Sequence, residues 1–183
     1  KVIVKMDNDD IGTINLLLTH KYFNNITLVV SDRLKGYQDI HNFYNDMAKL
    51  EDDSDFFLIF NSDAMIKTSN WDLLLKSYNP GDYLILHHNM VNGRGSGDYF
   101  FPIISQAYYK LCGFISLVYD YDGYLYNMAI KAGIRTTINL DIEHFDAEYD
   151  LDSMKTAHEY IRTRDNTIFN KEFNRVLNII KKV

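Results

Sequence analysis

The sequence has little cysteine, little proline and no long apolar run. Cys112 is the only cysteine among 183 residues, which excludes an internal disulfide. A single thiol fits a reducing compartment, so we expect a cytoplasmic protein, with peripheral attachment to membranes left open. The two prolines exclude a long proline-rich linker. No apolar stretch reaches the length of a membrane span, and we therefore expect no transmembrane segment.

Positive charge is also in short supply. The 19 lysines and arginines are outnumbered by 25 acidic residues, which gives a formal net charge of -6. This balance argues against a nucleic-acid partner, because binding a phosphate backbone needs a clustered basic patch. A small ligand that carries phosphate would then need local cations, a metal ion or helix N-termini.

The stretch at residues 55–65 contains the strongest local signal. Residues 56–60 are apolar and rich in aromatic side chains, and the run is too short for a helix. Such a run predicts a strand that is covered on both faces. It ends abruptly in Asn61, Ser62 and Asp63. Ligands of open α/β sheets bind at the carboxyl ends of strands, where a carboxylate can hold a hard cation.

Apolar periodicity divides the chain into strands that alternate with helices. We expect strands at 2–4, 26–30, 56–60, 83–86, 100–104 and 136–142, and helices at 11–22, 38–50, from Ser69 onward, 107–111, 122–132, 154–162 and 168–180. The alternation predicts an α/β fold with a central, mostly parallel sheet flanked by helices, and with 56–60 as an interior strand. We expect one domain over 1–150, with 151–183 as a helical tail packed on it and the glycine-rich segment 92–98 as a mobile loop.

Acidic side chains gather where several of these strands end. They are Asp7, Asp9 and Asp10, then Asp63, then Asp120 and Asp122, and His144 follows a later strand. In a parallel sheet these ends share one edge, which indicates a site. Aspartates are also common helix caps, and capping of the following helix explains Asp122 equally well.

Four segments, taken in order, carry a family resemblance. Residues 2–10 resemble a strand that ends in acids beside a nucleotide base. A second match is a segment with a glycine at 33–37, followed downstream by the asparagines Asn42 and Asn45. Residues 57–65, with Thr68 and Trp71-Asp72, resemble a strand with a DxD motif, and 120–133, with His144, resemble a helix with an acceptor-side acid and a late metal-binding histidine. Together they are similar to GT-A-type glycosyltransferases of the broad family-2-like group, over roughly residues 1–145. The DxD position reads Asn61-Ser62-Asp63, so an amide replaces the first acid.

The resemblance implies a GT-A-like, Rossmann-like domain that moves a sugar from a nucleoside-diphosphate sugar, with UDP as the first candidate, to a glycan or glycoprotein. It would be a metal-dependent hexosyl- or deoxyhexosyltransferase. Asp63 and His144 would hold Mn²⁺ or Mg²⁺. Asp122, or failing that Asp120, would accept the proton of the acceptor hydroxyl. Asp7 and Asp9 would accept hydrogen bonds from the base or ribose, and Arg33 or Lys35 would meet phosphate. The full set of donor-binding residues would be Asp7, Asp9, Asp10, Arg33, Lys35, Gly36, Tyr37, Asn61, Ser62 and Trp71.

Two other functions compete with this interpretation. A nucleotidyltransferase that makes nucleotide sugars would normally have a glycine-rich, basic loop after its first strand, whereas residues 7–10 here are mostly acidic. A glycan-binding domain without turnover is compatible with the 14 tyrosines and the incomplete DxD motif. The adjacent His87 and His88 would point to opposite faces of a strand, so we predict no metal site there.

Overall fold

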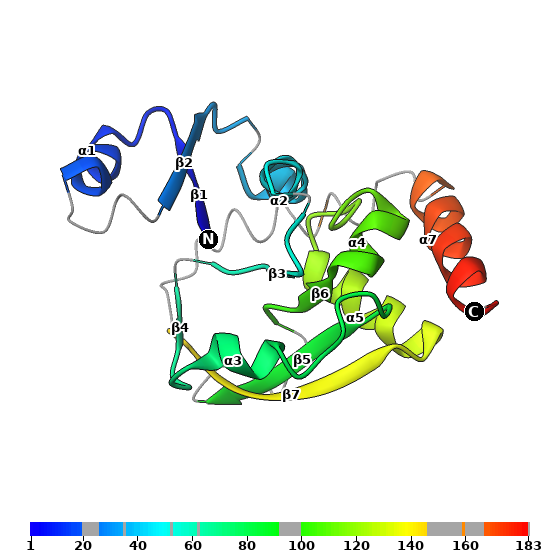
Figure 1. The fold of residues 1–183 in the computed structure, drawn as a ribbon. Helices are drawn as coiled ribbons and strands as arrows, with labels where there is room; N and C mark the ends of the chain where they lie inside the picture. Colours follow the sequence, from blue (N-terminus) through cyan, green and yellow to red (C-terminus); the bar gives the residue numbers. More distant parts are fainter. Residues whose placement is uncertain are drawn as a thin grey trace.

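The computed structural model describes residues 1–19, 26–34, 36–51, 53–61, 63–91, 100–145, 159 and 167–182. Within these residues the fold is α/β, with two separate sheets (Figure 1). The smaller sheet pairs β1 (Val2–Asp7) with β2 (Ile26–Ser31) in parallel, and α1 (Ile11–Thr19) follows β1 along the chain. The α/β class predicted from the alternation of elements is therefore confirmed.

The larger sheet has five strands in the order β3-β6-β5-β7-β4. Their bounds are β3 Phe56–Leu58, β4 Ala64–Ile66, β5 Ile85–Val91, β6 Ile103–Ser105 and β7 Arg135–His144. The helices are α2 (Ile40–Lys49), preceded by the 3-10 turn η2 (Gly36–Asp39), then α3 (Trp71–Leu75), α4 (Gln106–Cys112), α5 (Tyr121–Ala132) and α7 (Thr167–Ile180).

The prediction of a mostly parallel sheet is wrong for these five strands. Only β5 and β7 pair in parallel, whereas β3–β6, β5–β6 and β4–β7 are antiparallel. Two adjacent parallel strands must be joined by a long crossover connection, usually through a helix. Strand β6 instead pairs with the preceding strand β5 in the opposite direction. The prediction of an interior strand at 56–60 is also wrong, because β3 lies at one end of the described sheet.

The strand directions nevertheless bring three carboxyl ends together. Strands β3 and β5 both run opposite to β6, and β7 runs parallel to β5, so β3, β5 and β7 share one direction. Strand β6 therefore begins at the edge where these three strands end. Asn61 and Asp63 follow β3, His144 ends β7, and Phe101 lies just before β6. This edge collects the side chains of the candidate site.

Both faces of the larger sheet are covered. Ile85 and Ile104 belong to a buried cluster that also contains side chains of α4, α5 and α7, while their neighbours Leu86 and Ile103 belong to a second cluster with Phe101 and α3. This is the alternation expected of strands, whose successive side chains point to opposite faces. Figure 1 shows α4, α5 and α7 grouped at one end of the sheet.

The C-terminal helix α7 packs on this core. The ring of Phe173 meets the ring of Tyr124 edge-on, with 5.8 Å between the centroids. The guanidinium of Arg175 donates to the carbonyls of Leu111 and Cys112 at 3.5 and 3.4 Å, at the end of α4. There it satisfies carbonyl groups that have no partner within the helix.

Most of the predicted elements match the structure in type and place. The helices expected at 38–50, 107–111, 122–132 and 168–180 correspond to α2, α4, α5 and α7. The helix expected at 154–162 and the loop at 92–98 lie outside the described residues. Strand β4 was not predicted, because its three residues directly follow a polar turn. No helix of the described residues is long and apolar enough to cross a membrane.

Asn45 of α2 holds the segment that leads into α5. Its Oδ1 accepts from the amides of Ile115 and Ser116 at 2.7 and 3.2 Å, and its Nδ2 donates to the carbonyl of Ser116 at 2.8 Å. One side chain therefore satisfies three backbone groups in a buried segment.

Replacing Asn45 by alanine should leave these three groups without partners. We expect Asn45→Ala to lower the free energy of unfolding by about 2–4 kcal/mol, measured by urea denaturation. Asn42→Ala is the matched control on the same helix. Among the described residues, Asn42 bonds only the side chain of Asp39, in an exposed contact, so its loss should change stability by less than about 0.5 kcal/mol. Equal effects of the two substitutions would contradict the role of Asn45.

His87 predicts a pH dependence of stability. The residue is 1% exposed, its ring nitrogens have no partner among the described residues, and burial lowers its pKa from 6.5 to about 4. Between these pH values the unfolded chain binds a proton that the folded chain does not, so stability falls as pH falls from 6.5 to about 4. The full difference corresponds to about 3 kcal/mol. His87→Leu should flatten this part of the stability profile, and an unchanged slope would assign it to other groups.

Candidate functional site

Asp63 and His144 meet where β4 pairs with β7. The register places Ala64 opposite His144, and the amide of Phe145 donates to the carbonyl of Asp63 at 2.7 Å. The side chains follow, with 3.1 Å between His144 Nε2 and Asp63 Oδ2. They are 14% and 33% exposed, respectively. The structure thus brings together the two residues that the sequence predicted as metal ligands.

The second carboxylate oxygen of Asp63 is unusual. Oδ1 is buried and has no hydrogen-bond partner within the part of the chain that the structure describes. A buried carboxylate oxygen without a partner costs free energy, and a cation would satisfy it. The described residues contain no group of three or more metal-ligating side chains. Asp63 and His144 therefore supply one carboxylate and one imidazole, which fit part of a ligand set for a divalent cation that phosphate oxygens and water would complete.

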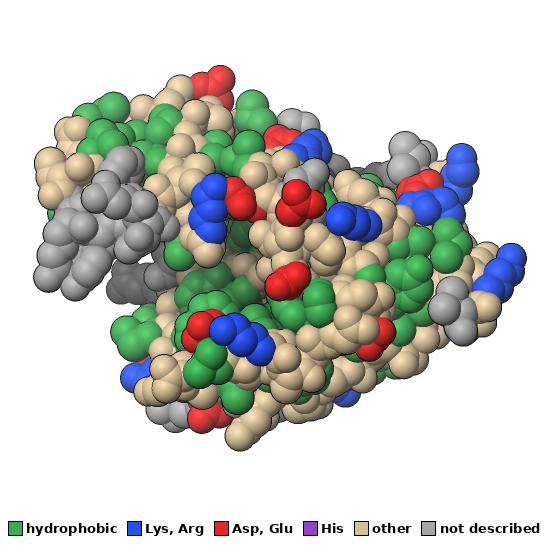
Figure 2. All heavy atoms as spheres, in the orientation of Figure 1, with side chains coloured by type: hydrophobic (Ala, Val, Ile, Leu, Met, Phe, Trp, Pro, Cys, Tyr) green, Lys and Arg blue, Asp and Glu red, His purple; other side chains and the backbone are tan. Residues whose placement is uncertain are grey.

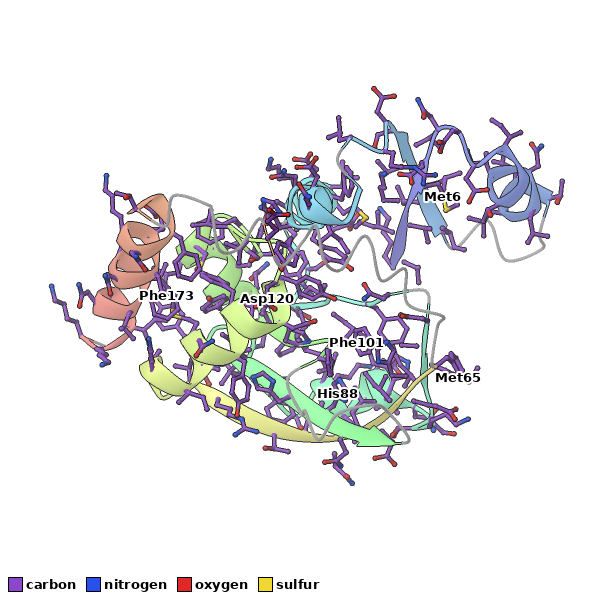
Figure 3. The ribbon with its side chains drawn as sticks, turned by 180° about the vertical axis from the view of Figure 1, so that it is seen from behind. Met6, Met65, His88, Phe101, Asp120 and Phe173 are labelled. Carbon is purple, nitrogen blue, oxygen red and sulfur yellow. The ribbon has the colours of Figure 1, made fainter. Side chains whose placement is uncertain are left out.

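Phe101 connects this pair to the next acidic residue. Its ring, 1% exposed, meets the ring of His144 edge-on with centroids 5.2 Å apart, and its amide donates to Asp122 Oδ1 at 3.2 Å. Its φ is 49°, a left-handed conformation that is strained for a bulky residue. The ring of His88 is stacked on the ring of Phe101 with centroids 6.2 Å apart, and Figure 3 labels both residues. Such strain persists only where the surroundings fix the residue, as the three contacts do here.

The structure assigns different roles to the two acids of α5. Asp120 is the N-cap, since its Oδ1 accepts from the amide of Gly123 at 3.3 Å, and it is exposed. The capping role considered for Asp122 therefore belongs to Asp120. Burial raises the pKa of Asp122 well above its ordinary value, and the negative charge of Asp120 adds to this, while the amide of Phe101 acts against it. A carboxylate with a raised pKa is a stronger proton acceptor.

Asn61 lies between two tyrosines. The hydroxyl groups of Tyr44, from α2, and Tyr121, from α5, both donate to Asn61 Oδ1. The two rings pack edge-on with centroids 4.8 Å apart. The residue at the first DxD position is thus held by both neighbouring helices.

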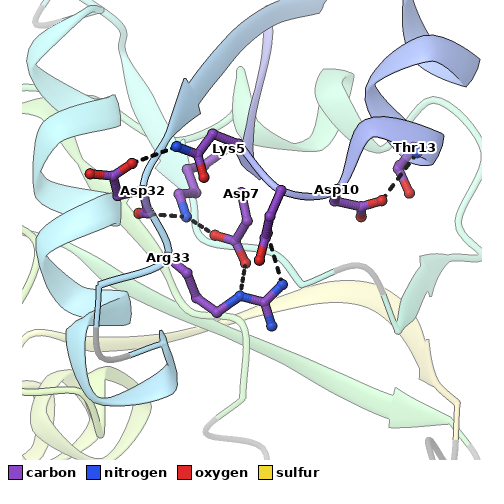
Figure 4. A network of polar contacts seen from close by, with 8 residues as sticks. Lys5, Asp7, Asp10, Thr13, Asp32 and Arg33 are labelled. Atoms are coloured by element: carbon purple, nitrogen blue, oxygen red, sulfur yellow. Dashed lines mark hydrogen bonds and ion pairs between the residues drawn. The ribbon is translucent and has the colours of Figure 1, made fainter.

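A second polar group lies on the two-stranded sheet (Figure 4). Arg33 Nε is 3.2 Å from Asp7 Oδ2, and its Nη2 is 3.0 Å from Asp9 Oδ1. Lys5 also pairs with Asp7. Asp10 caps α1 by accepting from the amide of Thr13 at 3.2 Å. The predicted phosphate-binding cation and the predicted base-binding acids therefore neutralise one another.

The positions of the remaining predicted donor-binding residues say little about ligand binding. Gly36 has a φ of 59° in a turn where its amide donates to the carbonyl of Arg33 at 2.8 Å. Trp71 begins α3 and packs, partly buried, on the second core cluster. Tyr37 belongs to η2, but its side chain lies outside the described part, as do Lys35 and Ser62.

The two polar groups belong to different parts of the molecule. Figure 3 shows Met6, which precedes Asp7, well separated from Phe101 and His88. The surface between the two parts is hollowed, with hydrophobic side chains visible inside the hollow (Figure 2). A ligand that reached both groups would have to lie across this hollow.

Sequence reasoning did not identify Phe101, Tyr44 or Tyr121. Their types are common in cores, and no spacing marks them as functional. The adjacent aromatic residues Phe100 and Phe101 were a weak signal, but neither a positive φ nor a contact with His144 can be inferred from sequence. Comparison with protein-family models, with curated proteins and with solved structures gave no match, so these residues are the basis for any functional conclusion.

The buried carboxyl group of Asp122 should make the stability of the protein depend on pH. Because its pKa is raised on folding, the folded state binds more protons than the unfolded state above the ordinary aspartate pKa, and stability is lost as pH rises through that range. Asp122→Asn should keep the contact with the Phe101 amide and remove the buried charge. We expect it to raise the free energy of unfolding at pH 7 by about 1–3 kcal/mol.

Two comparisons test this explanation. The gain from Asp122→Asn should disappear near pH 3, where the wild-type carboxyl is protonated in both states. The matched control is Asp46→Asn at an exposed site on α2, which should change stability by less than about 0.5 kcal/mol. A destabilised Asp122→Asn protein at pH 7 would show that the charge is compensated.

Proposed function

We propose that the protein transfers a sugar from a nucleoside-diphosphate sugar to a hydroxyl group of a glycan or glycoprotein, with a divalent cation as cofactor. The observation that best supports this is the buried, unpartnered Oδ1 of Asp63 beside His144. The finer fold assignment, a GT-A-like domain, is part of the same proposal. It is supported by the shared edge at which β3, β5 and β7 end.

The leaving group explains why a cation is needed. When the sugar leaves, negative charge grows on the diphosphate, and Mn²⁺ or Mg²⁺, when bound, would stabilise that charge. Asp63 and His144 would hold the ion. Within this site, the described side chains include no lysine or arginine whose charge could replace it, and Arg33 already pairs with Asp7 and Asp9.

Asp122 is the best candidate for the proton acceptor. It is tied to Phe101, which in turn contacts His144, so the acid and the metal pair are joined through one residue. The raised pKa suits a group that must take a proton from an acceptor hydroxyl. Asp120 is occupied by the cap of α5 and is the weaker candidate.

Phe100 and Phe101 would limit wasteful hydrolysis. Their rings lie 5.7 and 5.2 Å from the ring of His144, centroid to centroid. Apolar rings on this side of the site exclude water and strengthen the electrostatic interactions of the pair.

The nucleotidyltransferase alternative is less well supported. That reaction needs cations after the first strand to bind a triphosphate. The arginine nearest to this position in the structure, Arg33, is neutralised by two aspartates. The glycan-binding alternative predicts sugar binding without turnover, and it is decided by the same experiment.

The test is to incubate the protein with Mn²⁺ and a panel of nucleotide sugars and to measure released nucleoside diphosphate. We expect release from one donor, and chelation should abolish it. Asp63→Asn and His144→Ala should each reduce turnover at least about tenfold and weaken Mn²⁺-dependent donor binding. Metal and donor should tighten each other's binding by the same factor.

Asp46→Asn is the charge-matched control, since Asp46 is exposed on α2 and, among the described residues, pairs only with Lys49. It should leave turnover unchanged. Pyrophosphate exchange in place of diphosphate release would support a nucleotidyltransferase. Glycan binding without release of either product would support the binding domain.

A further inference from the structure

The environment of Asn61 assigns a direction to its amide group. The hydroxyl groups of Tyr44 and Tyr121 converge on Oδ1, the second at 3.4 Å. A carbonyl oxygen has two lone pairs, and two hydroxyl donors fill both. Nδ2 has no hydrogen-bond partner in the part of the chain that the structure describes, so it remains a donor without an acceptor.

The two tyrosines are themselves held rigidly. Tyr121 is 1% exposed and begins α5, and Tyr44 packs against the same core from α2. Their rings meet edge-on at 4.8 Å. Asn45, the next residue of α2, bonds the backbone at Ile115 and Ser116 in the segment leading to α5. Because both helices are fixed, the hydroxyl groups determine the orientation of the amide.

We propose that Tyr44 and Tyr121 are positioning residues that orient Asn61 so that Nδ2 donates a hydrogen bond to a diphosphate oxygen of the donor. This inference rests on the proposed function. Asn61 is two residues from Asp63, so their Cα atoms are at most about 7 Å apart. A diphosphate that shared a cation with Asp63 would therefore lie within reach of Asn61.

The proposed hydrogen bond explains why a neutral amide at position 61 suits a diphosphate ligand. An aspartate at position 61 would add an acceptor next to a diphosphate, which offers only acceptors. An amide that rotated by half a turn would present Oδ1 in the same unfavourable way, and the two tyrosines oppose that rotation. Asn61 thus acts as a hydrogen-bond donor to the ligand and not as a weakened metal ligand.

The ligand test uses isothermal titration with UDP and with uridine, both in the presence of Mn²⁺. Tyr44→Phe and Tyr121→Phe should each weaken UDP binding about three- to tenfold, the scale of one net hydrogen bond. Uridine binding should not change, because uridine has no diphosphate. Tyr78→Phe is the matched control: its hydroxyl donates to the Thr137 carbonyl at 3.3 Å at an exposed site, and its loss should leave UDP affinity unchanged.

Asn61→Asp separates a donor role from a metal-ligand role. If Asn61 donates to the diphosphate, Asn61→Asp weakens Mn²⁺-dependent UDP binding at pH 7 and leaves uridine binding unchanged. A merely structural effect would weaken the binding of both ligands. If position 61 is a metal ligand, Asn61→Asp tightens Mn²⁺-dependent UDP binding, and the inference is overturned.

A spectroscopic measurement of the Asn61 amide itself completes the design. In protein with ¹⁵N-labelled asparagine, the Asn61 side-chain NH₂ signals, assigned by their loss in Asn61→Asp, should shift in Tyr44→Phe and should shift on addition of UDP to the wild type. Wild-type UDP binding that both Tyr→Phe variants retain in full would overturn this inference and leave the proposed function intact. A wild-type protein that does not bind UDP or any other nucleoside diphosphate would overturn both.

Discussion

The reversed direction of β6 is the constraint on which the site depends. Because β6 lies between β3 and β5 and runs against both, its first residues are placed where those strands end. Phe101 is thereby brought against His144 and within hydrogen-bond distance of Asp122. In a wholly parallel sheet β6 would begin at the opposite edge, and the acid of α5 would have no link to the histidine of β7.

Sequence periodicity predicted the elements better than it predicted their arrangement. Helix α5 was clear because apolar residues recur at helical spacing and Gly133 ends the helix with a φ of 71°. The meeting of Asp63 and His144 followed from the rule that polar residues at strand ends share an edge. The direction of β6 could not be predicted, because the side-chain pattern of a three-residue strand is the same whether it pairs parallel or antiparallel with its neighbours.

The polar residues show a similar division. That an aspartate at the start of α5 serves as a cap is a local effect, and sequence could indicate it but not decide between Asp120 and Asp122. The pairing of Arg33 with Asp7 and Asp9 depends on the loops after β1 and β2 lying together in space. Their long-range contact turned a predicted phosphate-binding residue into the counter-ion of predicted nucleotide-binding acids.

The N-terminal part of the molecule has a structural weakness with a dynamic consequence. Helix α1 has no buried residue, and β1 and β2 form a sheet of their own, joined to α2 by contacts such as the Lys5 ammonium over the Phe43 ring at 3.8 Å. Two strands and one exposed helix bury too little apolar surface to be stable alone. This part should therefore open locally without global unfolding, as a separate cooperative unit in amide hydrogen exchange. A ligand that bound across the hollow would bind only molecules in which this part is folded. Its observed affinity would therefore be lower than its affinity for the folded form.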